Sequence, residues 1–385
     1  MKYGVFVATP RGCQQALRLV QALQDNHGDT GEYQDSYESL QGEAEVFVHC
    51  KQAKVMEELA KDLPLKWQSY QKLSEVFAQG MGNYDGLIFV MATGIVVRTL
   101  APHLVSKLLD PAVLVMDDGG RNIISLLSGH IGGANRLTAY LARELEANPV
   151  ITTATDVNNL LAPDVVAADL QCLPTPKRNL PLFNGSLLTG QRLVYWVDSQ
   201  LKARENYEAV LQRHQIAYRL VENLSEALVG IDSEKLYVVI TAQAENLPFE
   251  KNILYLQPRR LIAGVGCRRN TPKELIAQAL VEACVSIGWS TGRISQLAST
   301  VVKADEAGLL TMAEELQVPI KFFRNQQMAE MIEKYQLKES NFVKKTIGIG
   351  NICEAAALCC VPQGRIALSK HKYEKVTVAL IWQKY

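Results

Sequence analysis

Short apolar runs alternate with stretches of helical spacing along residues 1–160. Apolar runs bounded by turn residues are typical of buried strands, and apolar residues three or four apart share one helix face. These patterns predict strands at KYGVFVA, EVFVHC, DGLIFVM, AVLVM and PVITT. They predict helices in CQQALRLVQAL, in GIVVRTLAPHLVSKLL with an interruption at Pro102, and in HIGGANRLTAYLARELEA. The alternation predicts an α/β domain at 1–160 with a mainly parallel sheet and flanking helices.

The middle of the chain, residues 161–255, has a weaker pattern. Prolines 163, 174, 176 and 181 make residues 161–185 resemble an irregular linker. A small α/β segment follows, with strands at QRLVYWVD and KLYVVITA around the helix KARENYEAVLQRH. We expect a second break at ENLPFEKNILYLQPRR, before the last domain begins.

Residues 256–385 repeat the alternation and predict a C-terminal α/β domain. Strands are predicted at RLIAGVG, KKTIGIG and KVTVALIWQ, and helices at TPKELIAQALVEACVSI, TMAEELQ and CEAAALCC. Three parts agree with a length of 385 residues, since domains commonly hold about 150 residues.

The charge is balanced overall but not along the chain. Forty basic residues match forty acidic ones, so a protein that coats nucleic acid or an anionic membrane is excluded. Residues 256–385 nevertheless hold 18 basic and 11 acidic side chains, a net charge of +7. This excess indicates either a solvated basic face or a region that attracts an anionic small molecule.

The compartment follows from the apolar runs and the cysteines. The first apolar run ends at Pro10, too early for a signal peptide, and no run approaches the ~20 residues of a membrane span. The eight cysteines form no C-x-x-C pair, which argues against a zinc ribbon or a redox motif. An aspartate pair with a single histidine is a weak basis for a metal site, so we predict none, with Mg²⁺ at Asp117 or Asp118 as the alternative. We therefore expect a cytoplasmic protein that binds neither membrane nor nucleic acid.

The candidate chemistry lies in loops between strands and helices, where open α/β sheets bind ligands. In FVMATGIVVR, Thr93 is a candidate helix cap and Gly94 allows close approach to the backbone. An ordinary helix start explains these two residues as well as an anion site does.

The densest polar segment is VMDDGGRNIISLLSGHIGGANR. Asp117, Asp118 and Arg121 follow a predicted strand, and Ser128, Gly129 and His130 are predicted to open a helix. Glycines weaken helix starts, so a ligand close to the backbone would explain several of them together. Turn chemistry and helix–sheet packing are the alternative. The binding candidates in this second half are Ser128, Gly129, Gly132, Gly133 and Asn135, and Asp117, Asp118 and His130 are candidate acid/base groups.

Two loops of the last domain complete the set. GVGCRRNTPKE carries Gly266, Arg268 and Arg269 before a helix, a suitable receptor for carboxylates because Arg binds them bidentately. Its two glycines lack the third glycine of a dinucleotide fingerprint, which weakens a nucleotide site. In GIGNICEAAAL, Glu354 either favours the helix dipole or serves as an acid/base group.

These motifs resemble those of the cobalt-precorrin-5A hydrolase family of anaerobic cobalamin biosynthesis. The resemblance rests on MATGIVVRTLAPHL, on DPAVLVMDDGGRNIISLLSGHIGGANRLTAYLA, on PVITTATDVN and, near the C-terminus, on GVGCRRNTPKELIAQAL and GIGNICEAAAL. Asn351-Ile352-Cys353 departs from the smaller residues expected before Glu354. The middle segment matches by position more than by motif.

The resemblance implies a hydrolase that opens the ring A δ-lactone of cobalt-precorrin-5A and releases the C20 fragment as acetaldehyde. The product is cobalt-precorrin-5B. Cobalt arrives inside the substrate, so no cofactor is expected on the protein. The expected partner is the corrinoid substrate, and neighbouring enzymes of the pathway are further candidates. A corrinoid carrier without catalysis is the main alternative, and a nucleotide-binding oxidoreductase, suggested only by the glycine-rich loops, is the other.

Overall fold

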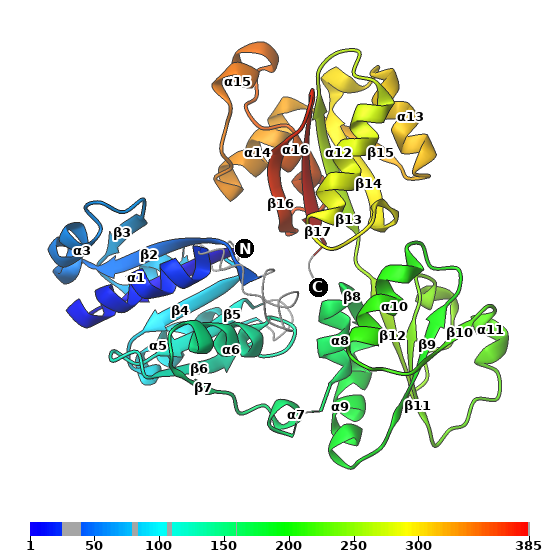
Figure 1. The fold of residues 1–385 in the computed structure, drawn as a ribbon, viewed down its shortest axis with the longest axis horizontal. Helices are drawn as coiled ribbons and strands as arrows, with labels where there is room; N and C mark the ends of the chain where they lie inside the picture. The colour runs from blue at the N-terminus through cyan, green and yellow to red at the C-terminus, as the bar shows by residue number, and fades with distance from the viewer. Residues whose placement is uncertain (25–39, 79–83, 106–109, 159, 384–385) are drawn as a thin grey trace. The chain divides into compact units, whose positions relative to one another are not determined.

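The computed structural model describes residues 1–24, 40–78, 84–105, 110–158 and 160–383. The chain divides into two compact units, Met1–Val165 and Val166–Tyr385. The first unit holds a seven-stranded sheet, and the second holds two five-stranded sheets (Figure 1). The structure therefore confirms the α/β class. The boundary predicted between residues 255 and 256 falls inside strand β12 (Ile253–Pro258).

The sheet of the first unit has the order β3-β2-β1-β4-β5-β6-β7. Its strands are β1 (Lys2–Val7), β2 (Glu43–His49), β3 (Lys66–Tyr70), β4 (Gly86–Val90), β5 (Ala112–Met116), β6 (Asn122–Leu127) and β7 (Asn148–Val150). The first five strands are parallel, as predicted. Strand β6 runs antiparallel to β5, and β7 is parallel to β6. The sequence analysis did not predict β6, because its residues lie inside the densest polar segment.

Helices cover both faces of this sheet, as predicted. On one face, α1 (Pro10–Gln24), α3 (Ala53–Leu59) and α6 (Ala134–Glu144) pack against strand residues such as Val5 and Leu114. On the other face, α4 (Leu73–Ala78) and α5 (Thr93–Leu100) pack against Phe6 and Phe89. Of the helix predicted from residue 94 onward, residues 106–109 lie outside the described residues. The short helices α7 (Ala154–Val157) and α8 (Pro163–Asp169) follow β7.

The order of the strands reverses between β1 and β4. From β1 the chain continues to β2 and β3 on one side, and from β4 it continues to β5 on the other. Such a reversal opens a crevice at the carboxyl ends of the two central strands, where open α/β sheets bind ligands. Thr9 and Thr93 follow these two strands.

The second sheet corrects the predicted linker. Its order is β10-β9-β11-β12-β8, with β8 (Cys172–Thr175), β9 (Leu193–Asp198), β10 (Tyr218–Val221) and β11 (Leu236–Ile240). Helices α9 (Leu180–Leu188), α10 (Arg204–Arg213) and α11 (Leu224–Ala227) accompany it. Residues 161–185 are not irregular, because Pro163 begins α8, Pro181 lies in the first turn of α9 and Pro174 lies on the edge strand β8. Proline is compatible with each of these positions. The second predicted break likewise contains β12.

The third sheet has the order β15-β14-β13-β17-β16. Its strands are β13 (Leu261–Cys267), β14 (Ile294–Thr300), β15 (Ile320–Phe323), β16 (Arg365–Lys372) and β17 (Val376–Trp382). Helices α12 (Lys273–Val285) and α13 (Ala307–Glu315) pack on one face, and α14 (Asn325–Tyr335) and α16 (Cys353–Cys360) pack on the other.

The prediction of a strand at KKTIGIG is wrong, because its first four residues belong to α15 (Asn341–Ile347) and the last three follow that helix without forming a strand. Val343 and Ile347, four residues apart, pack together against the neighbouring core, which is helical spacing. Gly348 ends the helix with a left-handed backbone, φ 85°.

A buried arginine joins the two sheets of the second unit. The Arg293 guanidinium lies 4.4 Å from the ring centre of Trp289, 4.6 Å from Tyr207 and 5.1 Å from Trp382. It also donates a hydrogen bond of 3.2 Å to the carbonyl oxygen of Leu170, just beyond α8. Burial lowers its pKa to about 10. Aromatic faces and carbonyl oxygens thus replace the carboxylate partner that such a charge usually has.

Candidate active site

Asp117 organises the turn between β5 and β6. Its carboxylate accepts hydrogen bonds from the backbone N–H groups of Gly119 at 2.9 Å, Arg121 at 3.2 Å and Asn122 at 2.6 Å. The Asn122 side chain donates another at 3.1 Å. Burial by itself raises the pKa of Asp117, but these hydrogen bonds outweigh it and hold the pKa below its usual value. A carboxylate stabilised in this way is a weak base.

Asp118 reaches the carboxyl end of β1. The Thr9 hydroxyl donates a short hydrogen bond to Oδ1 of Asp118, and the Gly12 N–H donates to Thr9 Oγ1 at 2.9 Å. The sheet places the end of β4 between the ends of β1 and β5, so Thr93 and Gly94 leave the same edge. Thr93 is the first helical residue of α5, and Ala92 holds the cap position without a side-chain hydrogen bond. The predicted cap at Thr93 is therefore wrong.

The structure separates the two halves of the polar segment. Strand β6 carries the chain away from Asp118, and six extended residues span roughly 20 Å. The loop 128–133 consequently lies at the opposite edge: a Cβ atom on Gly132 would lie 3.4 Å from the carbonyl oxygen of Asp110, which precedes β5. The aspartates and His130 therefore do not form one site within the first unit.

The loop 128–133 is a tight turn and does not begin the helix. The predicted helix start at Ser128 is wrong, because α6 begins at Ala134. The Ala134 N–H donates to the Ser128 carbonyl at 3.1 Å, and Ser128 itself has a φ of 59°. A Cβ atom on Gly132 would overlap Ser128, and one on Gly129 would lie 2.7 Å from Asn135 Oδ1. Close packing thus accounts for both glycines, and Gly133 supplies a φ of 83° before α6.

Asn135 ties this turn to β6 and to the segment that follows β7. Its Oδ1 atom accepts a hydrogen bond of 2.6 Å from Ser125, and its Nδ2 atom donates one of 3.0 Å to Thr153. The Ser128 hydroxyl lies close by in sequence and is buried without a hydrogen-bond partner in the described part of the chain. The segments SGHIGGAN and PVITTATD therefore meet at one edge of the sheet.

His130 lies between two carboxylates at this edge. Nε2 is 2.6 Å from Asp156 Oδ2 and 3.2 Å from Thr155 Oγ1, and Nδ1 is 3.1 Å from both carboxylate oxygens of Asp164. Burial by itself lowers the pKa of His130, but the hydrogen bonds and charges of Asp164 and Asp156 raise it above its ordinary value. The arrangement therefore favours the imidazolium form.

The sequence analysis missed Asp156 and Asp164. Asp156 lies in the segment PVITTATDVN, which contributed to the family resemblance, but no pattern singled out the residue itself. Asp164 follows Pro163 in the stretch interpreted as a linker, so no pattern marked it.

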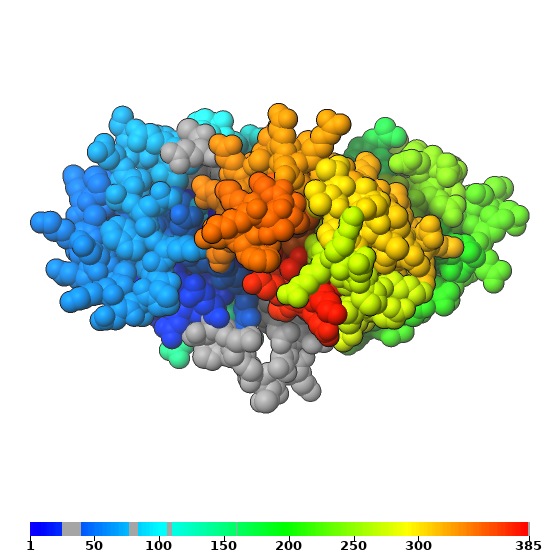
Figure 2. All heavy atoms as spheres, turned by 90° about the horizontal axis from the view of Figure 1, so that it is seen from above, coloured from blue at the N-terminus to red at the C-terminus, as the bar shows by residue number. Residues whose placement is uncertain are grey.

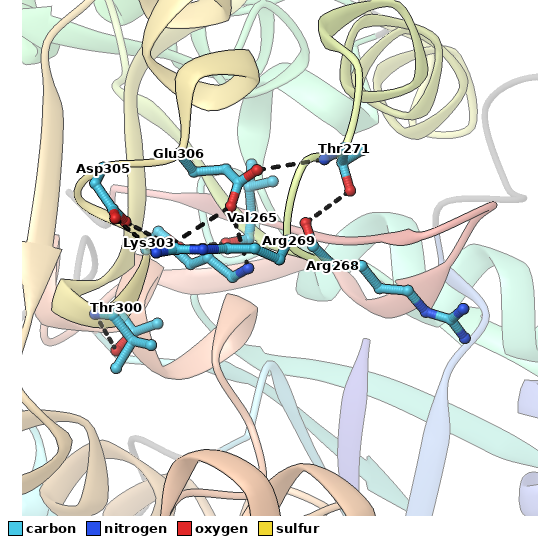
Figure 3. Close-up of polar contacts among 10 residues, drawn as sticks. Val265, Arg268, Arg269, Thr271, Thr300, Lys303, Asp305 and Glu306 are labelled. Carbon is cyan, nitrogen blue, oxygen red and sulfur yellow. Dashed lines mark hydrogen bonds and ion pairs between the residues drawn. The ribbon is translucent and has the colours of Figure 1, made fainter.

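The loops after β13 and β14 hold a second charged cluster (Figure 3). Arg269 donates to the two oxygens of Asp305 at 2.5 and 2.6 Å and lies 3.9 Å from the buried Glu306. Glu306 also pairs with the buried Lys303 at 3.4 Å and accepts the Thr271 N–H at 3.3 Å. The Arg269 guanidinium therefore joins the two loops through its ion pairs.

Arg268 differs from its neighbour. Figure 3 shows its guanidinium pointing away from the cluster, and within the described residues it has no hydrogen bond or ion pair. Its backbone is held, since its N–H donates to Lys375 at 3.0 Å and its carbonyl accepts from the Thr271 hydroxyl at 2.8 Å. The segment between β13 and α12, yellow-green in Figure 2, lies on the surface. The Arg268 guanidinium is thus exposed and without a protein partner among the described residues. The nearby Cys267 is not an activated thiol, because burial raises its pKa to about 11.

The glycines of β13 serve packing. A Cβ atom on Gly264 would overlap the Cys353 carbonyl oxygen at the start of α16. One on Gly266 would lie 2.6 Å from Thr377 Oγ1 on the paired strand β17. The structure places Gly266 in the sheet and shows close strand packing there.

Glu354 is buried in the first turn of α16. Its Oε1 atom accepts the Lys370 N–H at 2.8 Å, and its Oε2 atom accepts a short hydrogen bond from Asn351 Nδ2. The Glu354 N–H donates to Asn351 Oδ1 at 3.3 Å. Asn351 is one of the residues that departs from the resemblance, and here it holds Glu354. Lys370 lies where the register of β16 and β17 shifts, so Glu354 satisfies a backbone N–H at an irregular strand.

Within the described ranges, no group of three or more His, Cys, Asp or Glu side chains is arranged to hold a metal ion. No helix in that part of the chain is long and apolar enough to cross a membrane.

Comparison with known proteins decides the family. Residues 75–156 match the model "Cobalamin synthesis G N-terminal", and residues 261–381 match "Cobalamin synthesis G C-terminus". A cobalt-precorrin-5A hydrolase of Salmonella typhimurium is 36% identical over 84% of this chain and 92% of its own length. The chain belongs to the cobalt-precorrin-5A hydrolase family. The predicted family is confirmed.

Two further similar proteins are more distant from this chain. The hydrolase of Priestia megaterium is 30% identical over 77% of this chain and 78% of its own length. A crystal structure of a cobalamin biosynthesis protein G homolog from Sulfolobus solfataricus covers 100% of this chain and 97% of that chain, with 18% identity and a TM-score of 0.48. A likeness at that level adds nothing to the assignment.

Proposed function

We propose that this protein hydrolyses cobalt-precorrin-5A, opens the δ-lactone of ring A and releases the C20 fragment as acetaldehyde. The product is cobalt-precorrin-5B. The observation that carries the proposal is the 36% identity with a cobalt-precorrin-5A hydrolase across 84% of this chain. Cobalt belongs to the substrate, and the proposal includes no cofactor resident on the protein.

The reaction needs proton transfer in two steps. In the first, water adds to the lactone carbonyl carbon, the acyl–oxygen bond breaks and the departing oxygen takes a proton. In the second, the new alcohol loses its proton, the carbon–carbon bond to the macrocycle breaks and acetaldehyde leaves, while the electron pair stays on the macrocycle. One positioned side chain typically contributes about 10²–10⁴-fold to such a step.

The candidate acid/base groups differ in how many hydrogen bonds to the protein they already make. Asp117 already accepts four hydrogen bonds, and both oxygens of Glu354 are occupied. These contacts favour structural roles for both residues. His130, paired with partly exposed Asp156, and Asp118, paired with Thr9, are better placed to take part in proton transfer, directly or through the paired group. Of these two, His130 has more charged neighbours, because a carboxylate lies at each of its ring nitrogens.

The remaining predicted residues have binding roles in this proposal. Backbone N–H groups near Gly129 or Gly132 are candidate donors to the developing oxyanion. Arg121 and Arg268 are candidate receptors for the acetate and propionate carboxylates of the corrinoid, since arginine binds carboxylates bidentately. Arg269 supports the loop that carries Arg268. Neighbouring enzymes of the pathway as partners and a cytoplasmic location remain part of the proposal.

Incubation of the purified protein with cobalt-precorrin-5A tests the function. Acetaldehyde should accumulate in step with loss of the substrate, one molecule for each lactone opened. A corrinoid carrier would bind the substrate, which changes the corrinoid absorbance, but would release no acetaldehyde. Binding without release would therefore overturn the proposal and favour the carrier.

A further inference from the structure

His130 lies in a row of three ionisable side chains, between Asp164 and Asp156. Asp164 on α8 faces Nδ1, and Asp156 on α7 faces Nε2. They are the charged groups that face this ring among the described residues, and Thr155 Oγ1 is the neutral group beside Nε2. All four residues lie in the first unit. A carboxylate on each nitrogen keeps both ring protons in place.

The exposed fraction of the side chains increases along this row. The side chain of Asp164 is 4% exposed, that of His130 is 11% exposed and that of Asp156 is 31% exposed. Asp164 is therefore the buried end of the row, and solvent or a ligand reaches these three side chains through Asp156. Oδ2 of Asp156 is held by the ring, whereas Oδ1 has no hydrogen bond or ion pair within the described residues. This second oxygen is available to take a proton.

We propose that Asp156 is the carboxylate that transfers protons in the lactone hydrolysis, and that His130 and Asp164 are the residues that position it. The inference rests on the proposed function and names a catalytic residue that the sequence patterns did not mark. His130 stays charged and fixes one oxygen of Asp156, and Asp164 fixes the tilt of the ring through Nδ1. The other oxygen of Asp156 faces the reacting water.

The proton count closes over the two steps. As the water oxygen bonds to the acyl carbon, Oδ1 takes one water proton, and it passes this proton to the departing lactone oxygen. In the second step, Oδ1 takes the proton of the alcohol while the carbon–carbon bond breaks and acetaldehyde leaves. Release of that proton to solvent restores the carboxylate. No oxidant, reductant or second substrate is needed.

Asp156→Asn tests the catalytic role, because the amide keeps the shape and cannot take a proton. We expect kcat to fall about 10²–10⁴-fold, with KM for cobalt-precorrin-5A changed far less. Asp156→Glu keeps a carboxylate and should recover part of kcat. A kcat for Asp156→Asn within a few-fold of the parent would overturn the proposal.

Asp164→Asn tests positioning with a readout that loss of stability does not move. Asp164 favours the charged ring, so the alkaline limb of the pH–rate profile should move to lower pH in this variant. An unmoved limb would overturn the positioning role. Nitrogen NMR of His130 in the parent offers a measurement that needs no variant: both ring nitrogens should carry protons near neutral pH, and a neutral ring would count against the proposal.

His214 provides the matched control. It forms an ion pair of 2.9 Å with Asp169 in the second unit, with 24% and 25% side-chain exposure, and has no part in the proposed site. His214→Gln should keep the parental kcat and pH profile, and equal losses in His214→Gln and His130→Gln would overturn the proposal. If the parent itself releases no acetaldehyde, the proposed function fails; if the parent is active and Asp156→Asn is equally active, only this inference fails.

Discussion

The carbonyl oxygen of Cys353 occupies the place that a side chain on Gly264 would need. The first turn of α16 rests on β13 at this point, and the next residue of that turn is the buried Glu354. Gly264→Ala should therefore push the helix from the sheet and destabilise the protein by roughly 1–3 kcal/mol. Urea unfolding measures the change as a shift in midpoint.

Gly185 offers a control for this substitution. It lies within α9, and a Cβ atom there would meet no atom within 4 Å. Gly185→Ala should be neutral or stabilise by about 0.5–1 kcal/mol, because alanine favours the helix. Similar midpoints for the two alanine variants would contradict the packing explanation for Gly264.

Substitution of Glu354 separates a structural from a catalytic role. In Glu354→Gln, the new amide nitrogen must face either Asn351 Nδ2 or the Lys370 N–H, and both are donors. We expect a loss of about 1–3 kcal/mol in the free energy of unfolding, the usual effect of an unpaired buried group. Thermal unfolding and acetaldehyde release should be measured together. Parental stability with a large fall in kcat would instead support the acid/base role predicted from the sequence.

The two adjacent arginines should differ in their effect on binding. Arg268→Ala removes an available guanidinium, so affinity for the corrinoid should fall roughly tenfold or more. Arg268→Lys keeps the charge but loses the planar fork and should recover only part of the affinity. Arg269→Ala breaks the contact with Asp305 and should affect binding less. Titration at two salt concentrations checks this, since exposed charge pairing weakens with ionic strength. Equal losses in both alanine variants would contradict the distinction.

The His130 cluster should make stability depend on pH in a defined direction. The pKa of His130 is raised in the folded protein, so its pairing contributes fully below the unfolded value of about 6.5. That contribution is lost as the pH rises through the folded value. His130→Asn lacks it, so the difference in melting temperature between parent and variant should shrink as the solution becomes alkaline. A difference that grows toward high pH would contradict the imidazolium assignment.

The sequence predicted the central strands because they are continuous apolar runs. Strands β1, β4, β5, β13 and β17 all lie where these runs occur. Polar strands were harder to predict: the edge strand β16, RIALSKHK, carries four basic side chains and has no fully buried position. The prolines after residue 160 were interpreted by type alone, whereas their positions at helix starts and on an edge strand decide their effect.

The candidate site was predicted residue by residue but not in its arrangement. The polar character of residues 117–135 was clear, yet the strand within them has a partly exposed pattern and reverses direction. This reversal determines which side chains lie close together, and no local sequence pattern predicts it. Asp164 illustrates the limit, because its contact with His130 spans 34 residues.

The reversal at β6 makes one continuous motif depend on two distant parts of the chain. Asp118 takes its hydroxyl partner from Thr9, 109 residues earlier, whereas His130 takes both carboxylates from residues that follow β7. Asp118 therefore depends on the segment before α1, which also contains the central strand β1 of the sheet. His130 depends instead on the segment after β7, which supplies both of its carboxylate partners. The ends of the first unit, though far from this motif in sequence, thus each complete one half of it.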